Sequence, residues 1–110
     1  MKVAVIGSRS IYVSDIGSHL PAGCTEIVSG GARGVDTCAA NYAKDMGLKL
    51  TEFLPDYSLW GKRAPLVRNK EIVNYADYVV AFWDGESRGT WFVLNYCKEI
   101  GKPYRIVYMR

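Results

Sequence analysis

The stretch Glu26-Ile27-Val28-Ser29-Gly30-Gly31-Ala32-Arg33-Gly34-Val35-Asp36 decides the fold. Its first four residues, with Ile27 and Val28 at the centre, predict a short β-strand that the two following glycines end. Apolar side chains then recur at helical spacing, which predicts a helix over residues 33–46 capped by Gly47. A strand that passes through a glycine-rich turn directly into a helix is typical of a parallel α/β sheet.

The same alternation of strand and helix patterns runs along the whole chain. Further strands are predicted at residues 3–6, 48–54, 78–83 and 104–108, and further helices at residues 14–20, 66–75 and 90–100. Ser14 is a candidate N-cap, and residues 56–65 are predicted to form a loop. We therefore expect an α/β fold of the Rossmann-like three-layer α/β/α type, with a mainly parallel five-stranded sheet, in one domain over residues 1–110.

Composition limits the class of protein. Hydrophobic residues make up 49% and charged residues 23% of the chain, as in ordinary globular domains. No segment approaches the roughly 18 continuous apolar residues of a membrane span, and the apolar run after Lys2 is too short for a signal peptide. Cys24, Cys38 and Cys97 form no CxxC pair, so we expect a cytoplasmic protein in which Cys38 and Cys97 act as small hydrophobic residues.

Charge and histidine content narrow the possible partners. The net charge of +3 suits an anionic ligand but falls short of the basic stripe of a dedicated duplex binder. His19 is the one histidine, which argues against a histidine-based triad or metal cluster. We therefore predict no metal and no cofactor.

The glycine turn itself is the strongest functional signal. Glycines let backbone N–H groups at a helix N-terminus approach a phosphate closely. Arg33 adds a possible bidentate contact to that phosphate, and Asp36 can cap the helix or accept from a sugar hydroxyl. The turn lacks the pattern of a P-loop or of GxGxxG, and the alternative is a tight turn that merely needs glycine. The candidate ligand-binding residues of this turn are Ser29, Gly30, Gly31, Arg33, Gly34 and Asp36.

Two more polar loops follow predicted strands. Gly7-Ser8-Arg9 follows the first strand, and Asp84-Gly85-Glu86-Ser87-Arg88-Gly89-Thr90 follows the fourth. Carboxyl ends of parallel strands meet at one edge of the sheet, so we expect these loops to converge with the glycine turn. The second loop can hold another anion or a ribose, or it is a solvated turn that Ser87 caps. Candidate ligand-binding residues here are Gly7, Ser8, Arg9, Asp84, Ser87, Gly89 and Thr90.

The segment between these loops supplies basic and aromatic candidates. Arg68 and Asn69 lie on the helix predicted at residues 66–75, where the alternative is a solvated basic face. The amide of Asn69 can read the edge of a base or a ribose. Tyr57 and Trp60, in the predicted loop, can stack on a base, cover a partner subunit or pack over the end of the sheet.

These motifs, in this order and spacing, resemble the SLOG superfamily. That superfamily joins the DNA-processing protein A (Smf) family and the LOG (Lonely Guy) cytokinin-activating hydrolases, and the chain looks most like its short stand-alone YspA-like members. Residues 29–36 match the SGGARG(I/V)D motif of the Smf branch, and Arg68-Asn69 matches its Arg-Asn. Residues 84–90 correspond to the loop that reads PGGxGTxxE in LOG enzymes, and Val93 stands where those enzymes place their catalytic glutamate.

The resemblance implies a Rossmann-like fold with a nucleotide-type ligand held between the glycine loops, and Val93 favours binding over hydrolysis. The leading hypothesis is therefore a domain that binds a nucleotide or a nucleotide-derived ligand. The first alternative is a nucleoside-phosphate N-glycosidase or phosphoribohydrolase, for which the candidate catalytic carboxylates are Asp36, Asp84 and Glu86.

The second alternative is binding of single-stranded DNA. In that mode Tyr57 and Trp60 would stack on bases, and phosphates would be contacted by Arg33, Lys62, Arg63, Arg68 and Lys70. Apolar side chains on the helix predicted at residues 90–100 indicate a homodimer or, equally, a core-facing stripe. These side chains are Trp91, Phe92 and Tyr96.

Overall fold

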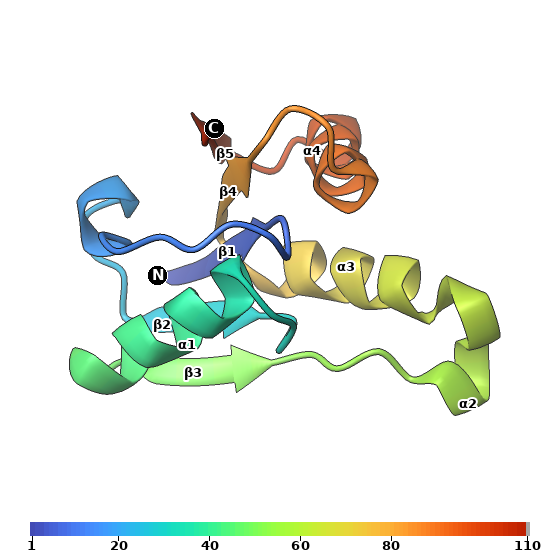
Figure 1. Cartoon of the computed structure of the whole chain (residues 1–110), viewed down its shortest axis with the longest axis horizontal. Coiled ribbons are helices and arrows are strands. Elements are labelled where there is room, and N and C mark those ends of the chain that lie inside the picture. The colour runs from blue at the N-terminus through green and yellow to red at the C-terminus, as the bar shows by residue number, and fades with distance from the viewer. Residues whose placement is uncertain (110) are drawn as a thin grey trace.

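Five parallel strands form one sheet in the computed structural model of the chain, which describes residues 1–109 (Figure 1). The strands are β1 (Lys2–Gly7), β2 (Glu26–Ser29), β3 (Lys49–Glu52), β4 (Tyr78–Trp83) and β5 (Tyr104–Tyr108). Their order is β3-β2-β1-β4-β5, and every neighbouring pair is parallel. The predicted α/β class and five-stranded sheet are confirmed. The direction of chain progression reverses between β1 and β4, which is where ligands bind in open sheets of this kind.

Helices cover both faces of this sheet. They are α1 (Val35–Asp45), α2 (Tyr57–Trp60), α3 (Ala64–Tyr75) and α4 (Arg88–Ile100), with 3₁₀ turns η1 (Gly17–His19) and η2 (Gly61–Arg63). One core cluster joins α1 to the sheet, and a second joins α3 and α4 to the opposite face. In Figure 1, α2 lies well beyond the carboxyl end of β3, at the end of a long connection.

The alternation of side chains in β1 separates the two core clusters. Val3 and Val5 pack in the cluster of α1, whereas Ala4 and Ile6 pack in the cluster of α3 and α4. Successive side chains of a strand point to opposite faces, so β1 is buried on both sides. The central strands β1 and β4 therefore carry the continuous apolar runs by which the sequence revealed them.

Two predicted segments differ from the structure. The helix predicted at residues 14–20 is wrong, because only η1 forms there; Ile16 is its N-cap and is buried in the core, and Ser14 is exposed. The loop predicted at residues 56–65 contains α2 and η2 instead. Asp56 starts α2, because its Oδ1 accepts from the backbone N–H of Leu59 at 3.2 Å. Pro65 lies in the first turn of α3, a position that proline tolerates, so this helix begins earlier than predicted.

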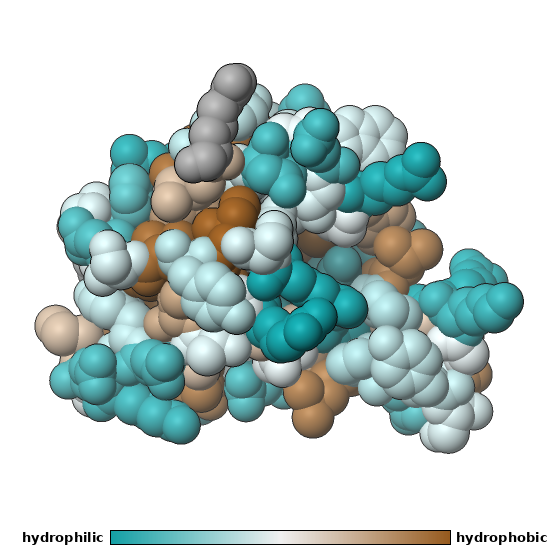
Figure 2. Space-filling model, in the orientation of Figure 1, coloured by the Kyte–Doolittle hydropathy of each residue, from teal (hydrophilic) through white to brown (hydrophobic). Residues whose placement is uncertain are grey.

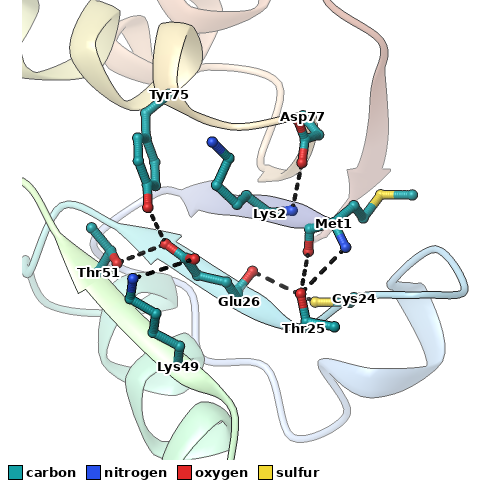
Figure 3. Close-up of polar contacts among 9 residues, drawn as sticks. All are labelled: Met1, Lys2, Cys24, Thr25, Glu26, Lys49, Thr51, Tyr75 and Asp77. Atoms are coloured by element: carbon teal, nitrogen blue, oxygen red, sulfur yellow. Dashed lines mark hydrogen bonds and ion pairs between the residues drawn. The ribbon is translucent and has the colours of Figure 1, made fainter.

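A polar network links neighbouring elements near the amino ends of the strands (Figure 3). The buried carboxylate of Glu26 accepts from the Tyr75 hydroxyl at 2.6 Å and from Thr51 Oγ1 at 2.7 Å, and Lys49 Nζ lies 3.8 Å away. Burial acts to raise the pKa of Glu26, but these hydrogen bonds and the charges of Lys49 and Lys2 outweigh it and lower the pKa. The network joins β2, β3 and α3 on the side opposite to the loops that carry the candidate site.

Among residues 1–109, no helix has the length and apolar character needed to cross a membrane.

Candidate functional site

An open cleft of about 470 Å³ lies at the carboxyl ends of β1 and β4, where the strand order reverses. We call it the main cleft. Its walls come from the end of β1 and the loop after it, the glycine turn after β2, one side of α3, and the loop that leads into α4. Segments far apart in the sequence thus meet at one edge of the sheet.

Most of the predicted ligand-binding residues line the main cleft. They are Gly7, Ser8, Arg9, Gly30, Asp36, Arg68, Asn69, Asp84, Ser87, Gly89 and Thr90. Gly31 and Arg33 line a smaller neighbouring cavity instead. Ser29 and Gly34 line neither cavity, and neither does Glu86, which is exposed.

Ser29 and Gly34 are buried parts of the turn. Ser29 Oγ accepts from the backbone N–H of Gly31 at 3.4 Å. Gly34 has a φ of 72°, and a Cβ there would overlap the carbonyl oxygens of Ser8 and Arg9. Glycine at this position therefore lets the loop after β1 lie against the start of α1. This close packing is enough to explain why position 34 is glycine, and no bound ligand is needed to explain it.

Asp36 and Arg68 face each other across the glycine turn. Asp36 Oδ2 accepts from the backbone N–H of Ala32 at 3.1 Å. Burial raises the pKa of this carboxyl, and the hydrogen bond from Ala32 and the charge of Arg68 offset that effect only in part. A carboxylate with a raised pKa in a cleft is a feature of functional sites, although structural networks produce it too.

Arg68 is buried, so the solvated basic face considered for it is wrong. Its Nη1 donates to the carbonyl oxygen of Gly30 at 2.7 Å and more weakly to that of Phe53 at 3.4 Å. Its Nε donates to Asn69 Oδ1 at 2.8 Å. Burial lowers the pKa of Arg68, against the charge of Asp36. Arg68 therefore holds the shape of the turn while the rest of its guanidinium lines the cleft.

The loop before α4 presents hydroxyl and N–H donors. The first hydrogen bond of α4 runs from the N–H of Trp91 to the carbonyl oxygen of Ser87 at 3.1 Å. The earlier N–H groups of the helix, those of Gly89 and Thr90 among them, have no acceptor within it. Ser87 occupies the N-cap but makes no capping hydrogen bond with its side chain, contrary to the alternative considered for it. Thr90 Oγ1 instead donates to Ser87 Oγ at 3.4 Å.

Asp84 organises this loop. Its Oδ1 accepts from the backbone N–H groups of Glu86 and Ser87, each at 2.8 Å. These two hydrogen bonds lower the pKa of Asp84, and Ser8 makes a minor contribution in the same direction. Asp84 is thus an ionised carboxylate that stabilises the conformation of the turn.

Ser8 stands out among the polar groups of the cleft. Its side chain is 5% exposed, and its Oγ has no hydrogen-bond partner among residues 1–109. Asp84 lies near enough for a weak hydrogen bond from Ser8 to contribute to its lowered pKa, but among residues 1–109 no atom meets the distance and angles of a full hydrogen bond with Ser8 Oγ. A buried hydroxyl without a partner costs free energy, and such groups are rare in native structures.

The floor of the main cleft is apolar. Ile6, Ile72 and Val93 all line it and belong to the core cluster beneath. Among them, sequence reasoning singled out Val93 alone, because Ile6 and Ile72 carry the same apolar signal as every other core residue. It also missed Ser10, Ala32 and Pro65, which complete the lining.

The neighbouring cavity, which we call the arginine cavity, has a volume of about 220 Å³. It is lined by Arg9, Gly30, Gly31, Ala32, Arg33, Leu54, Pro55 and Arg68. Three arginines in so small a space give it a strongly cationic wall.

The aromatic candidates lie outside both cavities. Tyr57 and Trp60 are on α2, with 57% and 45% of their surface exposed, and Figure 2 shows pale side chains of intermediate hydropathy over this corner. The Tyr57 hydroxyl is close enough to Arg68 to influence its pKa. On α4, Trp91 is exposed, while Tyr96 is half-buried and donates to Asn74 Oδ1 at 2.9 Å.

The part of the chain that the structure describes contains no cluster of three His, Cys, Asp or Glu side chains suited to a metal ion. His19 instead packs edge-on against Phe82, with 5.3 Å between the ring centres.

The chain matches no protein-family model, and comparison with curated proteins and with solved structures finds no significant match in either group.

Proposed function

We propose that this chain is a SLOG-type domain that binds a nucleotide or a nucleotide-derived ligand in the main cleft. The observation that carries the proposal is the buried Ser8 hydroxyl, which has no hydrogen-bond partner among residues 1–109 and lines the same cleft as the first turn of α4. A phosphate oxygen would accept from this hydroxyl and from the free N–H groups of that turn, which also carries the positive end of the helix dipole. This hydrogen bond would offset the free-energy cost of burying the Ser8 hydroxyl.

The rest of the cleft suits a nucleoside. Asn69 uses Oδ1 to accept from Arg68, which leaves its amide N–H groups free to donate to a base or a ribose. Ile6, Ile72 and Val93 offer an apolar surface to the flat side of such a group. A cleft of about 470 Å³ lies within the usual range for small-molecule sites.

Binding is favoured over hydrolysis by the character of the acidic groups. Val93 is apolar and buried at the position where the LOG resemblance implies a glutamate. Asp84 already accepts two backbone hydrogen bonds, and Glu86 lies outside the cleft. An N-glycosidase of the LOG type is the second candidate, because the raised pKa of Asp36 provides one carboxyl in the cleft with the character of a general acid.

Calorimetry of the purified chain against the common nucleoside monophosphates tests the proposal. Ser8→Ala is expected to weaken binding about tenfold or more, because it removes a hydrogen bond to a charged group. Ser14→Ala is the matched control, since Ser14 is exposed and outside the cleft. Absence of binding to every nucleotide, more highly phosphorylated forms included, would overturn the proposal. Release of free base that depends on Asp36 would favour the hydrolase instead.

A homodimer remains part of this proposal. Trp91 on α4 has 57% of its surface exposed, and a second copy of the chain packed on α4 would cover this side chain. Sedimentation of the wild type and of Trp91→Ala tests whether this side chain is covered by a second copy.

A further inference from the structure

The arginine cavity adjoins the main cleft. Arg9, Gly30, Ala32 and Arg68 line both cavities. The glycine turn and the Arg68 side chain packed against Gly30 therefore lie at the junction between them. A bound molecule that passes over this junction would contact both cavities.

The arginine cavity holds positive charge that the protein compensates only in part. The side chains of Arg9 and Arg33 are exposed, and the one ion pair among residues 1–109 is that of Lys49 with Glu26. Two acids lie near the turn: Asp36 Oδ2 would lie 3.1 Å from a Cβ on Gly30, and Glu52 Oε2 would lie 3.5 Å from a Cβ on Gly31. Two carboxyl groups against three guanidinium groups leave the cavity with a net positive charge.

Arg68 links the two cavities. Its Nε and Nη1 are committed to Asn69, Gly30 and Phe53. Its Nη2 donates to no acceptor among residues 1–109 and is not enclosed by them. Because the guanidinium is fixed by its other donors, this free group is preorganised for an anion at the junction.

From these observations we infer that the ligand carries phosphate groups on two sides of its sugar, one bound in the main cleft and the other in the arginine cavity. The inference rests on the proposed function and specifies its ligand class. At about 220 Å³, the arginine cavity is below the usual range for a drug-sized ligand. It therefore suits a phosphate group and not a second nucleoside, which points to a nucleoside bisphosphate.

Three adenosine compounds separate this inference from the proposed function: the 5′-monophosphate, the 5′-diphosphate and the 3′,5′-bisphosphate. The bisphosphate is expected to bind about tenfold or more tightly than either of the others, because a charge-assisted contact to Arg33 is gained. The diphosphate controls for charge, since its second phosphate extends from the same end of the sugar. The guanosine series is measured in parallel to allow for the identity of the base.

The readout is the ratio of the dissociation constants of monophosphate and bisphosphate. Arg33→Gln is expected to bring this ratio close to one, because Arg33 lines the arginine cavity and does not line the main cleft. Arg105→Gln is the matched control, because Arg105 is an exposed residue on β5 that lines neither cavity and should leave the ratio unchanged.

Several results would overturn the inference. Equal affinity for monophosphate and bisphosphate would do so while the proposed function stands. An equal gain for the diphosphate that survives Arg33→Gln would do so as well. Affinity for oligothymidylate that exceeds that for the bisphosphate and rises with length would replace the inference with a polymeric ligand. If none of these compounds binds, the proposed function fails together with the inference.

Discussion

Arg68 Nη1 donates to the carbonyl oxygen of Gly30 at 2.7 Å, and this hydrogen bond joins α3 to the turn that follows β2. A Cβ on Gly30 would lie 2.6 Å from the same nitrogen. The two residues therefore depend on each other: the Arg68 guanidinium occupies the space that a side chain at position 30 would need, and only glycine leaves that space free.

Replacement of this arginine is expected to destabilise the fold. Arg68→Gln removes the donors to Gly30 and Phe53 and leaves Asp36 without its nearest cation. We expect a loss of about 3 kcal/mol in the free energy of unfolding, measured with urea. Arg63→Gln, in the exposed turn η2, should stay within about 0.5 kcal/mol of wild type. Equal stability of the two variants would show that Arg68 has no structural role.

Two glycines of the candidate site should respond oppositely to alanine. Gly34→Ala forces a side chain into a φ of 72° and against the Ser8 and Arg9 carbonyl oxygens, so it should cost more than about 2 kcal/mol. Gly89→Ala meets nothing within 4 Å in the first turn of α4, and it should stabilise by about 0.5 kcal/mol. Thermal unfolding of both variants checks the pair. A stable Gly34→Ala would mean that this turn has freedom the structure does not show.

The Glu26 network predicts a specific dependence of stability on pH. Because the pKa of Glu26 is lowered in the folded state, its contribution is present above the ordinary value of 4.5 and is lost as the pH falls through the folded pKa. Wild type should therefore exceed Glu26→Gln in stability at neutral pH, and the difference should shrink below about pH 4.5. Urea titrations at several pH values measure it. A difference that does not vary with pH would contradict this role.

Asp36 should show the opposite sign. Its pKa is raised in the folded state, so the fold binds the proton more tightly than the unfolded chain does, and stability falls as the pH rises from the ordinary value of 3.8 through the folded pKa. Asp36→Asn keeps an acceptor for the Ala32 N–H and removes the charge. We expect this variant to be at least as stable as wild type at neutral pH. A marked loss would show that the charge of Asp36 supports Arg68 more than burial opposes it.

Strands and the glycine turn were predictable because their signals are local. The apolar runs of β1 and β4 and the spacing that starts α1 depend on neighbouring residues alone. Residues 14–20 and 56–65 were mispredicted for a different reason. Ile16 is fixed by tertiary packing, and the four-residue helix α2 is too short to leave a periodic pattern.

The site was predictable in outline and not in detail. Loops at the carboxyl ends of parallel strands must converge, so most of their polar residues were found. The burial of Arg68 was missed because a basic residue on a helix is usually solvated, and its acceptors on Gly30 and Phe53 are distant in sequence. Ile6 and Ile72 could not be distinguished from the core to which they also belong.

The amino ends and the carboxyl ends of the strands carry different groups of polar residues. Glu26 holds β2, β3 and α3 together at the amino ends of the strands, whereas the candidate recognition groups gather at the carboxyl ends. Substitutions of exposed loop residues at the carboxyl ends, such as Arg33, therefore leave the Glu26 network intact. Because the Glu26 network and these loops lie at opposite ends of the strands, mutations in the loops can change ligand specificity while the network still holds the sheet together. A site built into the network would not evolve in this way.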